Sequence, residues 1–91
     1  MNFKEYVRDH SSEFRHSYIY DAYGKVGVVV VTNRGDVGWS ICNKKDNFCK
    51  AKGKMIAFKR ATSGKGNSLY NVPVEYRSQI REKVSYLSLG N

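Results

Sequence analysis

The densest apolar stretch of the chain lies near its middle and has the residue types of a β-strand. Residues 26–32 contain five valines and a threonine, and β-branched side chains favour strands. The Asn-Arg-Gly-Asp sequence at residues 33–36 is typical of a turn, because Gly35 can adopt a positive φ. Residues 37–42 then alternate between apolar and small or polar side chains. Together these segments predict a β-hairpin over about residues 25–43.

The pattern before the hairpin predicts a helix over residues 2–16. Phe3, Tyr6 and Phe14 form its apolar side, while the serines at positions 11 and 12 offer an earlier end. A third strand around residues 17–21, or sheet pairing between two protomers, would complete the sheet that the hairpin begins.

Two further helices are predicted after the hairpin. One covers about residues 47–61, with Asp46 or Asn43 as its N-cap. Its interior glycine, Gly53, suggests close approach by another backbone, a phosphate or a partner helix. The other begins near Asn71 after a loop at residues 62–71, with Pro73 in its first turn. The apolar positions at helical spacing are Phe48, Ala51, Met55 and Phe58 in the first of these helices, and Tyr76, Ile80, Val84 and Leu87 in the second.

This order of elements predicts an α+β fold in a single domain, residues 1–91. A hairpin is not stable alone in water, so we expect a small antiparallel sheet covered by two or three helices. A chain of 91 residues also buries a modest share of its surface, and we therefore expect a homodimer.

Charge adds a second feature, because the net charge of +8 is concentrated in one segment. Residues 44–65 hold eight basic residues and one acidic residue, a net +7, whereas the remainder holds eight basic and seven acidic residues. No acidic side chains are interleaved at spacing i+4 to balance the cations, so a bound polyanion explains them better than a solvated helix face. The candidate RNA-binding residues are Lys44, Lys45, Lys50, Lys52, Lys54, Lys59, Arg60 and Lys65.

Aromatic residues add candidates for base stacking. Trp39 lies in the second hairpin strand beside the basic segment, and Tyr70 lies in the loop after Gly64-Lys65-Gly66. Either side chain could stack on an unpaired base or pack in the core.

Other chemistry is not indicated by the sequence. Cys42 and Cys49 have neither zinc-finger spacing nor a nearby histidine base, so no metal site and no cofactor are expected, and Cys49 is interpreted as a buried structural thiol. No pair of carboxylates stands out as an acid–base couple, which argues against an enzyme. No apolar stretch is long enough to span a membrane, and the N-terminus lacks a signal-peptide pattern, so we expect a cytoplasmic protein.

The segment 38–61 carries a longer pattern, with Lys45-Asp46 followed by Gly53, Ile56-Ala57 and Arg60-Ala61. It resembles a stretch of small tailed-phage proteins, Ser/Asn-Pro-Lys-Asp-x-Phe followed by Lys-x-x-Gly-Arg-x-Ile-Ala-x-x-Arg-Ala. Here Lys44 replaces the proline and Lys54 replaces the arginine after the glycine.

The resemblance extends to TifA-like proteins, the phage inhibitors of the ToxIN toxin–antitoxin system. It implies a small, basic, dimeric RNA binder that blocks an endoribonuclease toxin by sequestration in the cytoplasm of an infected bacterium. The RNA would then be carried by Lys45, Lys52, Lys54, Lys59 and Arg60. The alternatives are a basic inhibitor that docks on an acidic host protein without nucleic acid, and a non-specific DNA-binding protein.

Overall fold

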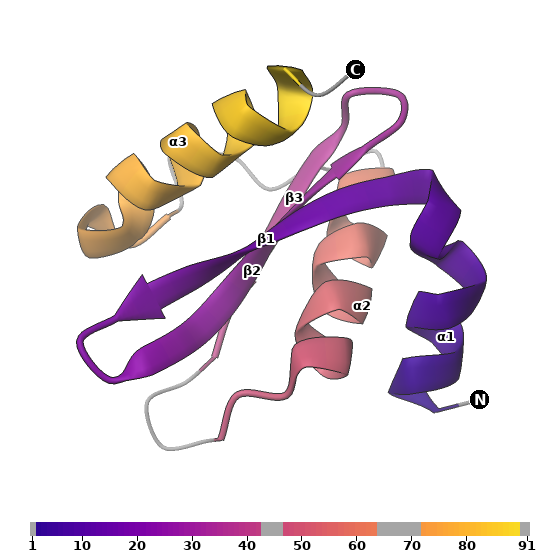
Figure 1. The fold of residues 1–91 in the computed structure, drawn as a ribbon, viewed down its shortest axis with the longest axis horizontal. Coiled ribbons are helices and arrows are strands. Elements are labelled where there is room, and N and C mark those ends of the chain that lie inside the picture. Colours follow the sequence, from indigo (N-terminus) through magenta and orange to yellow (C-terminus); the bar gives the residue numbers. More distant parts are fainter. Residues whose placement is uncertain (1, 43–46, 64–71, 90–91) are drawn as a thin grey trace.

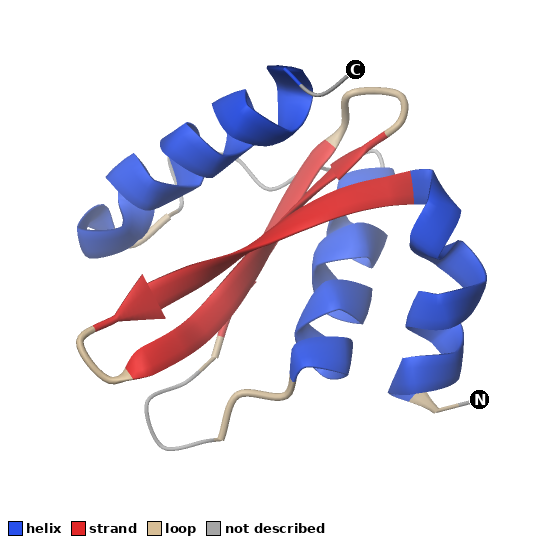
Figure 2. Ribbon diagram, viewed as in Figure 1, coloured by secondary structure: helices blue, strands red, loops and turns tan. Residues whose placement is uncertain are grey.

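A computed structural model describes residues 2–42, 47–63 and 72–89 of the chain. Its elements in chain order are α1 (Phe3–His10), the 3-10 turn η1 (Ser11–Glu13), β1 (Phe14–Asp21), β2 (Gly24–Thr32), β3 (Val37–Ile41), α2 (Lys50–Thr62) and α3 (Val74–Leu89). The strands form one antiparallel sheet in the order β1-β2-β3 (Figure 2). Helix α3 lies on one side of the sheet, and α1 and α2 lie on the other (Figure 1). The predicted α+β fold is therefore confirmed.

The predicted hairpin corresponds to β2 and β3, which pair from Gly27 with Ile41 to Val31 with Val37. The third strand expected around residues 17–21 is β1, which pairs with β2 and has an irregularity between Ile19 and Tyr20. Since β2 is central and both faces of the sheet are covered, its residues Val28 to Val31 are buried without alternation.

The first helix is shorter than the predicted range of 2–16, because it ends at His10. The Ser11 hydroxyl donates a hydrogen bond to the Arg8 carbonyl oxygen at 2.9 Å, which satisfies an acceptor at the helix end. After η1, Phe14 pairs with Thr32 and enters the core as part of β1. The prediction placed Phe14 in the helix because its spacing fitted a helical stripe as well as a strand.

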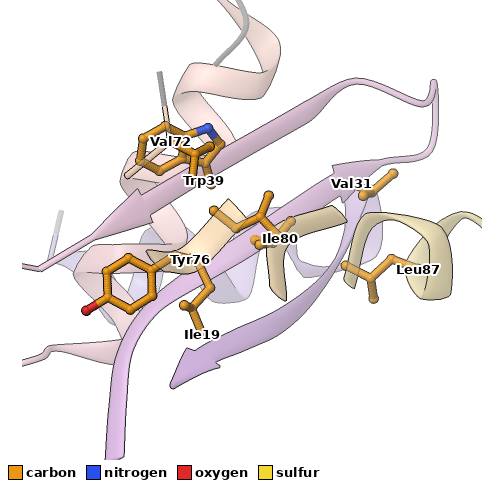
Figure 3. Close-up of a cluster of buried hydrophobic side chains, with 8 residues drawn as sticks. Ile19, Val31, Trp39, Val72, Tyr76, Ile80 and Leu87 are labelled. Atoms are coloured by element: carbon orange, nitrogen blue, oxygen red, sulfur yellow. The ribbon is translucent and has the colours of Figure 1, made fainter. Parts of the chain in front are cut away.

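On one face of the sheet, large apolar side chains of α3 pack against the strands. Tyr76, Ile80 and Leu87 are buried there, and Val84 is partly buried, which confirms the predicted stripe. Figure 3 shows Ile80 in the middle of this cluster, with Leu87 near Val31 at one end. The buried members are Ile19, Val29, Val31, Trp39, Val72, Tyr76, Ile80 and Leu87.

The opposite face packs against smaller side chains. Ala57, Phe58 and Ala61 of α2 join Phe14, Val28 and Val30 of the sheet. A Cβ atom added at Gly38 would collide with the Ala57 carbonyl oxygen and lie 2.7 Å from the Ala61 nitrogen. Helix α2 therefore lies close to β3 only because Gly38 has no side chain.

Helix α2 differs from its prediction in both its start and its buried side. It begins at Lys50 with Cys49 as N-cap, whereas the proposed N-caps Asp46 and Asn43 lie outside the described residues. Phe58 is the one buried member of the predicted apolar side within the helix, and Gly53, Ala57 and Ala61 complete the buried set. Contact with β3 at this short distance selects small residues, which hydrophobic periodicity does not detect. A Cβ atom added at Gly53 would lie 3.0 Å from the Phe48 ring, so close packing accounts for this glycine.

The C-terminal helix begins at Val74, directly after Pro73. Of the loop predicted at residues 62–71, Thr62 belongs to α2, and residues 64–71 lie outside the described part of the chain.

Candidate nucleic-acid interface

Five of the predicted RNA-binding residues lie on α2, on the side of the sheet that also carries α1. They are Lys50, Lys52, Lys54, Lys59 and Arg60. The other predicted positions, Lys44, Lys45, Lys65 and Tyr70, lie outside the described residues. Within the described residues, ion pairs join Arg8 to Asp9 and His10 to Glu13, so no described carboxylate pairs with an α2 cation.

Three lysines converge on one tyrosine ring at the β1 side of α2. The Nζ atoms of Lys25, Lys54 and Lys50 lie 4.4, 5.6 and 6.0 Å from the centre of the Tyr18 ring. A ring at this range attracts a cation through its quadrupole but leaves the net charge in place. With His16, whose ring centre is 5.3 Å from that of Tyr18, these residues form what we call the Tyr18 cluster. A bound anion would relieve the repulsion among its ammonium groups.

His16 is affected by its position in this cluster. Partial burial lowers the pKa of its imidazole, and the positive charge of Lys54 lowers that pKa further. The neutral form is therefore favoured at neutral pH. A neutral imidazole can donate or accept a hydrogen bond beside the lysines.

A second basic site lies on the other flank of α2, along the open edge of β3. A cavity of about 510 Å³ is lined by Lys52 and Arg60, and its described lining contains no acidic residue. Arg60 is fixed over the strand edge, because its Nη1 donates a hydrogen bond to the Trp39 carbonyl oxygen at 3.1 Å. We call this cavity the β3 groove.

Both cysteines line the β3 groove. Cys42 is half-buried and Cys49 is exposed, and both are thiols. The prediction of a buried Cys49 is therefore wrong, because α2 begins after this residue and leaves it at the exposed N-cap.

Lys59 lies over an aromatic ring of α1, and Lys52, which also lines the β3 groove, lies near another. The Lys59 Nζ atom is 5.1 Å from the Tyr6 ring centre, and the Lys52 Nζ atom is 6.0 Å from that of Phe3. The basic segment of the sequence thus becomes a surface that surrounds the exposed side of α2, rather than one flat patch.

Sequence reasoning missed Lys25, His16 and Tyr18. They lie on β1 and β2, far from the basic segment in sequence, and antiparallel pairing brings them to one place. One signal was available, because His16 and Tyr18 are two residues apart and side chains at that spacing share one face of a strand.

Trp39 does not present its ring to solvent. The residue is 8% exposed and belongs to the cluster between the sheet and α3, where Figure 3 shows its indole beside Val72. Of the two roles expected for Trp39, base stacking and core packing, its buried position fits core packing.

The described residues contain no group of three or more His, Cys, Asp or Glu side chains that could hold a metal ion. Among the helices of this part of the chain, none has the length and apolar character to cross a membrane. No protein-family model matches the chain, and neither a curated protein nor a solved structure matches it.

Proposed function

We propose that this protein is a non-enzymatic RNA-binding protein that holds RNA on the basic surface around α2. The observation that supports this most strongly is that the α2 cations have no carboxylate partner among the described residues. Lys25 of β2 adds a further cation to this surface at the Tyr18 cluster. Each phosphate neutralised by such a cation releases condensed counterions, which gives affinity without sequence recognition.

The arrangement of α2 favours RNA over duplex DNA. A helix that reads a major groove must protrude, because its whole exposed side enters the groove. Helix α2 instead packs on the sheet with α1 beside it, where Tyr6 and Phe58 have ring centres 6.3 Å apart. Its cations therefore lie along the flanks, where an irregular or single-stranded backbone can follow them.

The consequence of binding would be sequestration without turnover. Since residues 38–61 resemble TifA-like proteins, we extend the proposal to a phage counter-defence role in the cytoplasm of an infected bacterium. A host toxin ribonuclease or another defence protein would be the protein partner, and the working unit would be a homodimer. The competing function is a protein inhibitor whose basic surface docks on an acidic host protein.

The test replaces charged side chains by the neutral, polar side chain of glutamine. The double variant Lys50→Gln/Lys54→Gln removes two charges from the Tyr18 cluster, and Arg81→Gln/Lys83→Gln removes two charges from α3 on the other side of the sheet. We would measure the affinity for a short single-stranded RNA by fluorescence anisotropy at several salt concentrations.

Wild type should bind more weakly as salt rises. The α2 variant should reduce the slope of log K against log salt by about 1.4, because each single-strand phosphate contact contributes roughly 0.7. The α3 variant should keep the wild-type slope. Equal slopes for all three proteins, or wild type that binds no RNA at low salt and copurifies without nucleic acid, would reject the RNA function.

A further inference from the structure

A second depression lies at the turn between β1 and β2 and differs from the β3 groove in the chemistry of its lining. This cavity of about 970 Å³ is lined by aromatic side chains, two carboxylates and one lysine. We call it the turn groove. Its lining includes Tyr20, Asp21, Tyr23, Lys25, Glu75 and Tyr76.

The turn groove presents two tyrosines to solvent, although an aromatic ring normally contributes to the core. Tyr23 is 98% exposed and Tyr20 is 44% exposed, so packing within the chain does not account for the Tyr23 ring. The side chain of Tyr86, on α3, is also exposed but does not line this groove, which makes it a suitable control.

The backbone groups of both tyrosines are hydrogen-bonded to neighbouring side chains. The Tyr23 amide donates a hydrogen bond to the Asp21 carboxylate at 2.7 Å, and Gly24 closes the turn with a φ of 133°. The Tyr20 amide donates to the Gln79 side-chain oxygen at 2.9 Å, and the Gln79 amide nitrogen donates to the Tyr20 carbonyl oxygen at 2.6 Å. The backbone that carries the two rings is therefore held by hydrogen bonds on both sides of the turn groove.

Charge determines which part of an RNA suits this groove. Lys25 lines the turn groove and also belongs to the Tyr18 cluster, so the groove opens beside the basic surface. Asp21 and Glu75 lie in the groove wall and would repel a phosphate. A nucleobase is uncharged, has faces that stack on tyrosine, and carries N–H donors that carboxylates accept.

We propose that the turn groove takes an unpaired nucleobase of the RNA, stacked on Tyr23 or Tyr20, while the adjoining phosphate contacts Lys25 and the Tyr18 cluster. This inference rests on the proposed RNA function and identifies its substrate class as single-stranded RNA. Bases in a duplex are already stacked and paired, and they cannot enter the groove without being extruded.

The experiment compares Tyr23→Ala, Tyr20→Ala and Tyr86→Ala on two probes, a short single-stranded RNA and a blunt-ended RNA duplex of the same length. We expect Tyr23→Ala or Tyr20→Ala to weaken single-strand binding by about 5-fold or more, which corresponds to the loss of one stacked base. In the same variants, duplex binding should change less than 2-fold, and Tyr86→Ala should match wild type on both probes. Tyr23→Phe should restore single-strand affinity, because stacking needs the ring and not the hydroxyl.

The outcomes separate this inference from the function on which it rests. If both tyrosine variants bind the single strand like wild type while Lys50→Gln/Lys54→Gln weakens binding, the base site is wrong and the RNA function stands. An equal loss of affinity for the single strand and the duplex also overturns the base site. If wild type binds neither probe at low salt, the RNA function itself is overturned. Thermal melting checks the fold, and the exposed position of Tyr23 makes its alanine variant the decisive one.

Discussion

The two helices that sandwich the sheet, α2 and α3, differ in what they place against it and in what they present to solvent. Helix α3 packs with large side chains, whereas α2 packs with glycine and alanine around Phe58. Helix α3 carries three basic and two acidic residues, while α2 carries five basic residues and no acidic one. We infer that α3 mainly supplies apolar burial, and that α2 lies close to β3 in order to support a cationic surface.

The largest effect expected from this comparison is a loss of stability on the α3 side. Ile80 is fully buried at the middle of its cluster, so Ile80→Ala should lower the free energy of unfolding by about 2–5 kcal/mol. Urea unfolding followed by circular dichroism measures this change. Any protein that remains folded should keep the wild-type salt dependence of RNA binding, and a changed slope would show that the two sides are coupled.

The next effect concerns the close contact between α2 and β3. Gly38→Ala places a methyl group against the Ala57 carbonyl oxygen, which belongs to the helix backbone and cannot move aside by itself. We expect a loss of about 1–3 kcal/mol in unfolding free energy. Because Arg60 bonds to the carbonyl of the neighbouring Trp39, displacement of α2 should also weaken RNA binding. Unchanged stability would contradict the tight approach of helix and strand.

The next effect concerns the lysines of the Tyr18 cluster, whose replacement should change stability little although it weakens RNA binding. Lys50→Gln/Lys54→Gln removes a like-charge pair at spacing i, i+4, whose repulsion costs about 0.2–0.5 kcal/mol, and also removes two weak contacts with Tyr18. The unfolding free energy should therefore stay within about 0.5 kcal/mol of wild type. A large destabilisation would mean that these lysines hold the fold and are not kept for a ligand.

The smallest effect is a dependence of stability on pH. Because the pKa of His16 is lower in the folded protein than its ordinary value of 6.5, the unfolded chain takes up its proton first as pH falls. The contribution of neutral His16 to stability is fully present above about pH 6.5 and is lost as pH falls below it. His16→Gln should flatten this part of the stability profile. If the variant keeps the wild-type profile, titratable groups other than His16 cause the pH dependence of stability.

The sequence predicted the parts of the fold that depend on local periodicity. The hairpin and the stripe from Tyr76 to Leu87 follow from spacing alone, and both are confirmed. The buried side of α2 was predicted correctly at Phe58 only, because burial of Ala57 and Ala61 depends on Gly38, which lies in another element. The helix start at Lys50 was not predicted either, because its N-cap Cys49 makes no side-chain capping hydrogen bond that a sequence motif could indicate.

The part of the candidate site that is formed by residues close together in the sequence was predictable. The α2 cations follow from a count of charges, and the structure adds that no described carboxylate pairs with them. The convergence of Lys25 and Tyr18 with α2 depends on strand register, which composition does not determine. The two tyrosines of the turn groove were overlooked because an aromatic residue in a sequence gives no sign of its exposure.

The double hydrogen bond between Gln79 and the Tyr20 backbone also affects how this sheet can grow. A strand at the edge of a sheet offers unpaired amide and carbonyl groups that can recruit a strand from another chain. At Tyr20 the side-chain amide of Gln79 occupies both groups, as a neighbouring strand would. Glutamate could accept from the amide but would set an oxygen against the Tyr20 carbonyl. By occupying both backbone groups, Gln79 blocks intermolecular β-pairing at this end of β1. Its replacement by glutamate would make the protein more prone to aggregate.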